Sequence, residues 1–212
     1  MTTGFPGSPR LQRGSLIAID QDKNSRTTIE FQYNPDTLTR RLTAQRVTGN
    51  EASGERSDVQ LLKGPPQETI SLEIELDATD QLEIGDSIAT SMGIYPALSA
   101  LEVLLYPDYD HVAKNEKSAQ RGLLELEPFQ APLTLFVWGQ KRTVPVRLTS
   151  FSITEESFDP NLNPIRAKAS LELQVLTYYD LGFESEGGKT FISYHQNLAQ
   201  RAKQYKSGRN RT

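Results

Sequence analysis

The chain has 212 residues, a length that accommodates one full hydrophobic core with a small appendage. Its hydrophobic content is 36%, and no apolar run approaches the ~20 residues that a membrane-spanning helix requires. With no cysteine, the sequence excludes disulfides, thiolate metal ligands and cysteine nucleophiles. Because residues 1–13 are rich in Gly, Pro and Ser and lack an apolar block, we do not expect export through a secretory signal peptide.

The net charge of −4 is unevenly distributed along the chain. Residues 187–212 contain no acidic side chain and six basic ones, which leaves −10 on residues 1–186; the six are Lys189, Arg201, Lys203, Lys206, Arg209 and Arg211. An acidic body with a basic tail is more typical of an assembly surface than of a nucleic-acid-binding domain, whose folded part is usually basic. Although Tyr205 lies among the basic residues, nucleic acid is not expected as a partner.

The residues after Gly14 predict a β-hairpin. Residues 15–20 form a short apolar strand, residues 21–25 a polar turn, and residues 29–33 alternate apolar and polar side chains as a half-buried strand does. A rigid corner is then expected, because proline fixes its own φ and disfavours helix in the residue before it. The corner consists of Asn34, Pro35 and Asp36, with Leu38 soon after it. A structural corner is favoured here over direct contact with a partner.

Two less regular segments follow the corner. Residues 39–47 predict a third strand with an exposed arginine face formed by Arg40, Arg41 and Arg46. Residues 48–66 are rich in Gly, Ser, Glu and Arg, and a loop this long inside a compact domain is unusual unless it binds something or orders late. We therefore expect this loop to reach a neighbouring molecule, with simple disorder as the alternative.

The middle of the chain predicts one strand and one helix. Residues 70–77 alternate strictly between apolar and polar side chains, which indicates an antiparallel strand with one face in water. Residues 77–86 predict an acidic turn. Residues 92–106 place Leu98, Leu101 and Leu105 at helical spacing, so they predict one amphipathic helix that Pro107 ends. Residues 107–122 predict a polar loop.

The second half returns to strands. Residues 133–138 and 144–153 alternate with period two, but Phe151 and Ile153 fall on the opposite parity from Val144 and Val146, as across a β-bulge. Residues 158–164 predict a loop, residues 167–175 a second long strand, and residues 190–206 a basic helix with a frayed end. These strands predict a mainly β (α+β) fold: an antiparallel barrel or sandwich with one flanking helix and a basic C-terminal helix.

The sequence offers no catalytic arrangement. The glycine-rich run before Lys189 and Thr190 misses the phosphate-loop pattern by one residue, and its two glutamates would repel phosphate. The acidic residues of 77–86 lack the calcium-loop pattern, and Asp108, Asp110 and His111 have no second histidine beside them. Because G-x-S-x-G is also absent, neither an enzyme nor a cofactor or metal site is expected.

Two short motifs resemble one family. Residues 31–38, F-Q-Y-N-P-D-T-L, are similar to the F-x-[FY]-N-P-x-x-[LI] signature near the start of contractile injection system tube proteins, and more narrowly of the tube-like baseplate adapters between spike and tube. Residues 163–169, which include Pro164, Arg166 and Ala167, resemble that family's P-x-R-A segment before the last long strand. The resemblance extends in layout over residues 14–178. Many such adapters carry a C-terminal LysM module, and none is recognisable here.

The resemblance implies a tube-type β-domain that assembles as a hexameric ring, caps the central spike hub and templates the first layer of inner tube. Its implied partners are further copies of itself, the spike hub protein, the inner tube protein and other baseplate components, without nucleic acid or direct membrane insertion. The implied location is the cytoplasm, within a contractile particle that is later released or docked at a membrane.

The sequence patterns and the resemblance together predict three parts of the chain: a flexible N-terminus (1–13), a tube-like β-domain (14–180) and a glycine joint with a basic helix (181–212). The candidate assembly contacts are Arg40, Arg41, Gly54, Arg56, Gly64, Lys203 and Lys206. The polar strand faces are interpreted either as the lining of a hydrated lumen or as plain solvent faces. Two other functions stay open: a ligand-binding β-barrel with a helical lid, and a nucleotide-dependent enzyme that uses the glycine-rich run.

Overall fold

The computed structural model describes residues 12–20, 25–46, 61–121 and 131–209. Within these residues the strands form a single seven-stranded antiparallel sheet in the order β2-β1-β5-β6-β7-β4-β3. The strands are β1 (Ser15–Asp20), β2 (Ser25–Glu30), β3 (Leu38–Thr43), β4 (Gln67–Asp77), β5 (Leu133–Val137), β6 (Thr143–Phe158) and β7 (Pro164–Val175). The antiparallel, mainly β prediction is confirmed.

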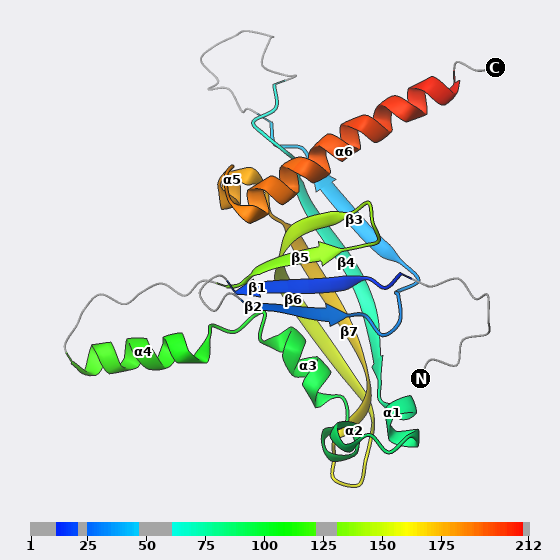
Figure 1. Cartoon of the computed structure of the whole chain (residues 1–212), viewed down its shortest axis with the longest axis vertical. Helices are drawn as coiled ribbons and strands as arrows, with labels where there is room; N and C mark the ends of the chain where they lie inside the picture. Colours follow the sequence, from blue (N-terminus) through cyan, green and yellow to red (C-terminus); the bar gives the residue numbers. More distant parts are fainter. Residues whose placement is uncertain (1–11, 21–24, 47–60, 122–130, 210–212) are drawn as a thin grey trace.

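The sheet folds over itself but does not close into a barrel. The first residues of β6 pair with β5, and the residues from Val146 onward pair with β7. The register shifts between Leu148 and Ser150, which confirms the bulge that the parity of the sequence predicts. The strands β1 and β2 therefore cross in front of the long strands β4 and β7 (Figure 1). In the described residues β2 and β3 are the two edges, and they are not paired with each other.

The core fills the space between the two layers. The long strands contribute the apolar side chains of their inner face, including Ile70, Ile74, Leu171 and Leu173. The crossing layer contributes Leu16, Phe31 and Phe136. The helices that flank the sheet are α1 (Thr79–Glu83), α2 (Ser87–Met92), α3 (Tyr95–Glu102), α4 (Tyr109–Gln120), α5 (Tyr178–Leu181) and α6 (Glu186–Arg209). Of these, α3 contributes Leu98 and Leu101 and α6 contributes Phe191 and Tyr194 to the same core.

The predicted helix over residues 92–106 is wrong in its extent. The chain breaks at Gly93, which has φ +56°, and a β-carbon there would overlap the carbonyl oxygen of Pro164. That close approach lets the N–H of Ile94 donate to the Pro164 carbonyl at 2.9 Å. Leu98 and Leu101 are buried as predicted, whereas Leu105 lies beyond the end of α3 and is exposed.

Helices also replace segments predicted as turns and loops. The polar loop over residues 107–122 contains α4, which begins because the Asp108 carboxylate accepts hydrogen bonds from the backbone N–H groups of Asp110 and His111. The acidic turn over residues 77–86 contains α1. The helix α5 was not predicted, although Thr177 and Asp180 form the capping box that starts it.

Three predicted boundaries also differ. The second strand ends at Glu30, so Phe31 and Tyr33 belong to the corner. The third strand is the shorter β3, and Arg46 instead bridges to Leu62. The C-terminal helix begins at Glu186 rather than at residue 190.

Candidate functional site

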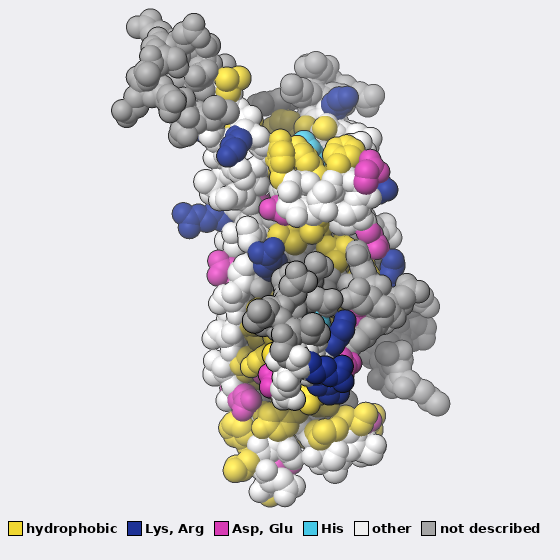
Figure 2. Space-filling model, turned by 90° about the vertical axis from the view of Figure 1, so that its left-hand side faces the viewer, with side chains coloured by type: hydrophobic (Ala, Val, Ile, Leu, Met, Phe, Trp, Pro, Cys, Tyr) yellow, Lys and Arg dark blue, Asp and Glu magenta, His cyan; other side chains and the backbone are white. Residues whose placement is uncertain are grey.

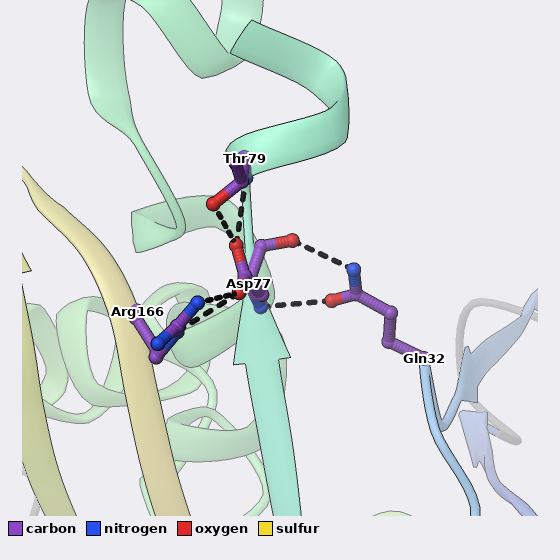
Figure 3. Close-up of polar contacts among 4 residues, drawn as sticks. All are labelled: Gln32, Asp77, Thr79 and Arg166. Atoms are coloured by element: carbon purple, nitrogen blue, oxygen red, sulfur yellow. Dashed lines mark hydrogen bonds and ion pairs between the residues drawn. The ribbon is translucent and has the colours of Figure 1, made fainter. Parts of the chain in front are cut away.

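The two sequence motifs meet at the end of β4, at the residue Asp77 (Figure 3). From the first motif, the Gln32 side-chain amide accepts a hydrogen bond from the Asp77 N–H at 2.9 Å and donates one to the Asp77 carbonyl at 2.7 Å. From the second, Arg166 donates from Nε and Nη2 to Asp77 Oδ2 at 2.8 and 2.7 Å. Thr79 donates its N–H to Asp77 Oδ1 at 2.7 Å and its hydroxyl to the same atom. We call these four residues the Asp77 junction.

The Asp77 junction is an ionised structural link. Burial alone would raise the pKa of Asp77, but the hydrogen bonds from Thr79 and the charge of Arg166 together hold it below its ordinary value. The Asp77 carboxylate in turn raises the pKa of Arg166. The Asp77 side chain is 16% exposed and that of Arg166 50%. Since both groups keep their charge near neutral pH, the junction holds elements together and is not suited to proton transfer.

The corner motif ties the two edges of the folded sheet together. Asn34 Oδ1 accepts from the Gly14 N–H, and Asn34 Nδ2 donates to the Gln12 carbonyl, both at 2.8 Å. Pro35 is half-buried and Asp36 is exposed. Because this segment runs from edge strand β2 to the opposite edge strand β3, it crosses the open side of the sheet. The residues of the corner therefore serve a structural turn, with Tyr33 exposed on its surface.

The second motif positions the helices at the end of the long strands. Pro164 is buried, and besides its bond to Ile94, the next carbonyl, that of Ile165, accepts from the Ala78 N–H at 2.9 Å. Ala167 is fully buried on the core face of β7. Sequence reasoning identified both motifs but missed Gln32, Asp77 and Thr79 as the residues that join them. No local pattern signals this contact, because it links positions 45 and 89 residues apart.

The outer face of the long strands carries only polar side chains. The register aligns Ser71, Glu172 and Ser150 in one row across β4, β7 and β6, and Glu73, Ser170 and Ser152 in the next. Every outward position in residues 69–77, 150–156 and 166–174 is polar. The rows border a shallow hollow of about 440 Å³. This polar face, as we call it, is an extended hydrated wall.

The described residues show no site for a metal or a phosphate. Among them, no group of three or more His, Cys, Asp or Glu side chains could hold a metal ion. Gly187 and Gly188 are buried at the start of α6, where a β-carbon would overlap Leu181 or the Gly182 carbonyl, so close packing explains the glycine run. The Gly188 N–H already donates to Ser185 Oγ at 2.9 Å. No helix in the described part is long and apolar enough to cross a membrane.

Residues 10–180 match the sequence model of the contractile injection system tube protein family. The chain belongs to this family. A chain in the virion of a native gene transfer agent particle is similar in structure, with 12% identity, a TM-score of 0.29 and coverage of 76% of this chain and 90% of that one. A TM-score this low adds nothing to the argument. No curated protein sequence matches the chain.

A tube protein of this family is a structural component of a contractile injection system, in agreement with a non-enzymatic role. The match takes in the seven strands of the described residues together with α1 to α4 and all but the last residue of α5, and it ends before α6. The Asp77 junction and the corner therefore lie inside the matched region, whereas α6 lies outside it.

The predicted assembly contacts of the tube protein fall in different environments. Arg40 is half-buried and donates to Glu68 and, at 2.8 Å, to the Tyr194 hydroxyl, so it holds α6 against the sheet, while Arg41 is exposed on β3. Gly64 lies against the ring of Tyr179. Lys203 is exposed on α6. Gly54, Arg56 and most of the predicted 48–66 loop lie outside the described residues, as does the side chain of Lys206.

Proposed function

We propose that this tube protein is a structural adapter of the baseplate, which links the central spike hub to the first layer of the inner tube and templates tube assembly. The proposal takes the family match as its starting point. The observation that carries it is the open sheet: in the described residues, two edge strands are unpaired, and the outer face of the long strands is polar over residues 69–77, 150–156 and 166–174. The proposed partners are the spike hub protein, the inner tube protein, other baseplate components and further copies of this chain.

Edge pairing supplies the ring contact in this proposal. An unpaired strand presents a row of backbone N–H and C=O groups that another strand can complete. Residues 25–28 of β2 are exposed, as are Arg41, Leu42 and Thr43 of β3. If β2 of one copy pairs with β3 of the next, the contact is heterologous, and it closes as a ring when the rotation between copies divides the circle. We propose six copies, with residues 14–180 as the assembling domain.

The polar face then lines the central channel. A continuous sheet around a ring turns one face of every copy inward, and a wall of Ser, Thr and mixed charges stays hydrated and binds passing molecules weakly. The pair Lys168 and Glu156, 3.8 Å apart, shows that opposite charges are interspersed on this face. We expect assembly in the cytoplasm, with no nucleic-acid partner and no direct membrane insertion.

The alternative of a ligand-binding barrel loses its main support, because the sheet does not close. The groove between α6 and the β5–β6 turn is lined mainly by polar side chains, among them Gln140, Lys141 and Ser193, and is unlike an apolar ligand cavity.

Two adjacent proline substitutions in β2 test the proposal. Consecutive N–H groups of a strand point to opposite sides, so of Thr27→Pro and Thr28→Pro one removes a hydrogen bond to β1 and the other an outward N–H. The variant that loses a hydrogen bond to β1 should have a lower melting temperature. The variant that loses an outward N–H should keep the fold, measured by circular dichroism. It should nevertheless abolish the rings seen by negative-stain microscopy when the chain is co-expressed with spike hub and tube proteins.

A wild-type chain that stays monomeric and ignores both partners would refute the adapter function. Rings that form equally well with both proline variants would refute edge pairing and leave the adapter function standing.

A further inference from the structure

The end of α6 projects away from the body of the molecule (Figure 1). Its first residues are held in place, since Gly187, Gly188, Phe191 and Tyr194 are buried. In residues 195–205 every side chain is exposed except Arg201, which is half-buried. We call residues 195–209 the tail helix. Apart from Arg201, which donates from Nη1 to the Lys141 carbonyl at 3.3 Å, a helix segment this exposed gains little from its own chain, which indicates that its further contacts lie elsewhere.

The tail helix carries both apolar and basic groups on its exposed side. Leu198, Ala202 and Tyr205 follow each other at spacings of four and three residues and so share one side of the helix. The Tyr205 side chain is 72% exposed. Lys203 lies beside this stripe, and no acidic residue follows position 186. The tail helix is therefore a basic surface with an apolar stripe.

The opposite end of the molecule has the complementary character. It consists of α1, α2 and the β6–β7 turn, which we call the acidic tip, and residues 64–113 contain no Lys or Arg. Its exposed side chains include Asp80 and Glu83, and its exposed apolar residues are Ile84 (81%), Ile88 (55%), Met92 (44%) and Leu162 (74%). Figure 2 shows hydrophobic side chains gathered at this lower end. Exposed apolar groups this close together mark an interaction surface.

We infer that the tail helix of one copy docks on the acidic tip of the next copy of this chain. Figure 1 places the two surfaces at opposite ends of the long axis, so they do not meet within one copy. Each copy carries one of each, and their charges are opposite while both bear exposed apolar side chains, which together favour a heterologous contact. The inference rests on the proposed assembly of copies, but it concerns a contact separate from the pairing of β2 with β3.

Disulfide trapping tests the contact directly, because the chain has no cysteine of its own. Glu83→Cys and Ala202→Cys are prepared as separate proteins and mixed under mild oxidation. The mixture should give a linked dimer on the order of tenfold more abundant than either variant alone, since a disulfide requires Cα atoms roughly 4–7 Å apart. The matched control is Glu83→Cys mixed with Lys189→Cys, an exposed position at the packed end of α6. Linkage no greater than in this control would overturn the inference, including the case in which the tail helix binds a different protein.

Charge exchange provides a second test, with sedimentation velocity as the readout. Lys203→Glu and Glu83→Lys should each weaken self-association on the order of tenfold. Mixing the two should restore it, because the reversed tail meets the reversed tip and the remaining pair is wild type. Unchanged association in both single variants would overturn the inference. If rings form with the spike and tube partners but the tail helix is not linked to the acidic tip, the proposed function stands and the inference fails. If the linkage forms without any such co-assembly, the adapter function is refuted and the contact between tail helix and acidic tip is retained.

Discussion

Replacing Gln32 by alanine should destabilise the fold although Gln32 is a half-buried polar residue in a loop. Its side-chain amide occupies the place of a missing strand: β3 pairs with β4 only as far as Leu72, and at Asp77 the Gln32 amide bonds to the backbone N–H and C=O instead. Gln32→Ala removes both bonds and leaves the backbone N–H of Asp77 without a protein partner, while the Asp77 carbonyl keeps only the Gln81 side-chain amide, 3.2 Å away. The corner is then less firmly attached to the long strands.

The expected cost follows from those two bonds. A buried backbone group that loses its partner costs about 1–3 kcal/mol, and water reaches this part-buried site and compensates for some of that loss. We therefore expect the free energy of unfolding to fall by about 2 kcal/mol, a substantial share of the roughly 5–15 kcal/mol typical of a folded domain. Gln32→Glu should cost at least as much at neutral pH, since a carboxylate cannot donate to the Asp77 carbonyl and adds a second negative charge beside the Asp77 side chain.

Equilibrium unfolding in urea measures this loss, with the fluorescence of Trp138, the single tryptophan, as the signal. The midpoint should fall while the slope stays constant, because the surface exposed on unfolding is unchanged. The control is Gln140→Ala at the exposed β5–β6 turn, which should stay within about 0.5 kcal/mol of wild type. Equal stabilities of Gln32→Ala and Gln140→Ala would refute the structural role of the Gln32 amide.

Three further variants probe the corner, the ion pair and the last helix. Asn34→Ala removes two hydrogen bonds to the segment before β1 and should lower the free energy of unfolding by about 1–2 kcal/mol in urea titrations; no change would contradict the role of the corner. The pKa of Asp77 is depressed in the folded state. Its ionised carboxylate therefore stabilises the fold fully at pH values above its pKa in the unfolded chain, and this stabilisation is lost as the pH falls through the folded pKa. Asp77→Asn should accordingly be less stable than wild type at pH 7 and lose less stability on acidification, and parallel pH profiles would argue against an ionised link to Arg166. Gly188→Ala should lower the melting temperature by several degrees, because the new methyl group overlaps the Gly182 carbonyl, whereas a shift like that of the exposed Lys189→Ala would rule out the close approach.

Local patterns were sufficient for the long strands and for the irregularity within one of them, but not for the bounds of β2 and β3. Side chains alternate between the two faces of a strand, so the strict alternation over residues 70–77 and the parity change before Phe151 predict β4 and the bulge of β6 from neighbouring residues alone. The same reasoning failed for α4, because a helix start set by one aspartate side chain is easily taken for a polar loop. It also predicted a single helix over residues 92–106, whereas the chain breaks at Gly93, because the carbonyl of Pro164 on a distant strand lies against that glycine.

The candidate site was only half predictable. The two motifs are legible as short residue patterns, and they were correctly associated with a tube protein of a contractile injection system. Neither pattern predicts that the two motifs meet at Asp77. Neither predicts that Arg40 lies half-buried against α6, where it donates to the Tyr194 hydroxyl. Both depend on which strands become neighbours, and that order follows from how the whole core packs and not from any one segment. The composition likewise separates an acidic body from a basic end, but only the folded chain places the tail helix and the acidic tip at opposite ends of one molecule.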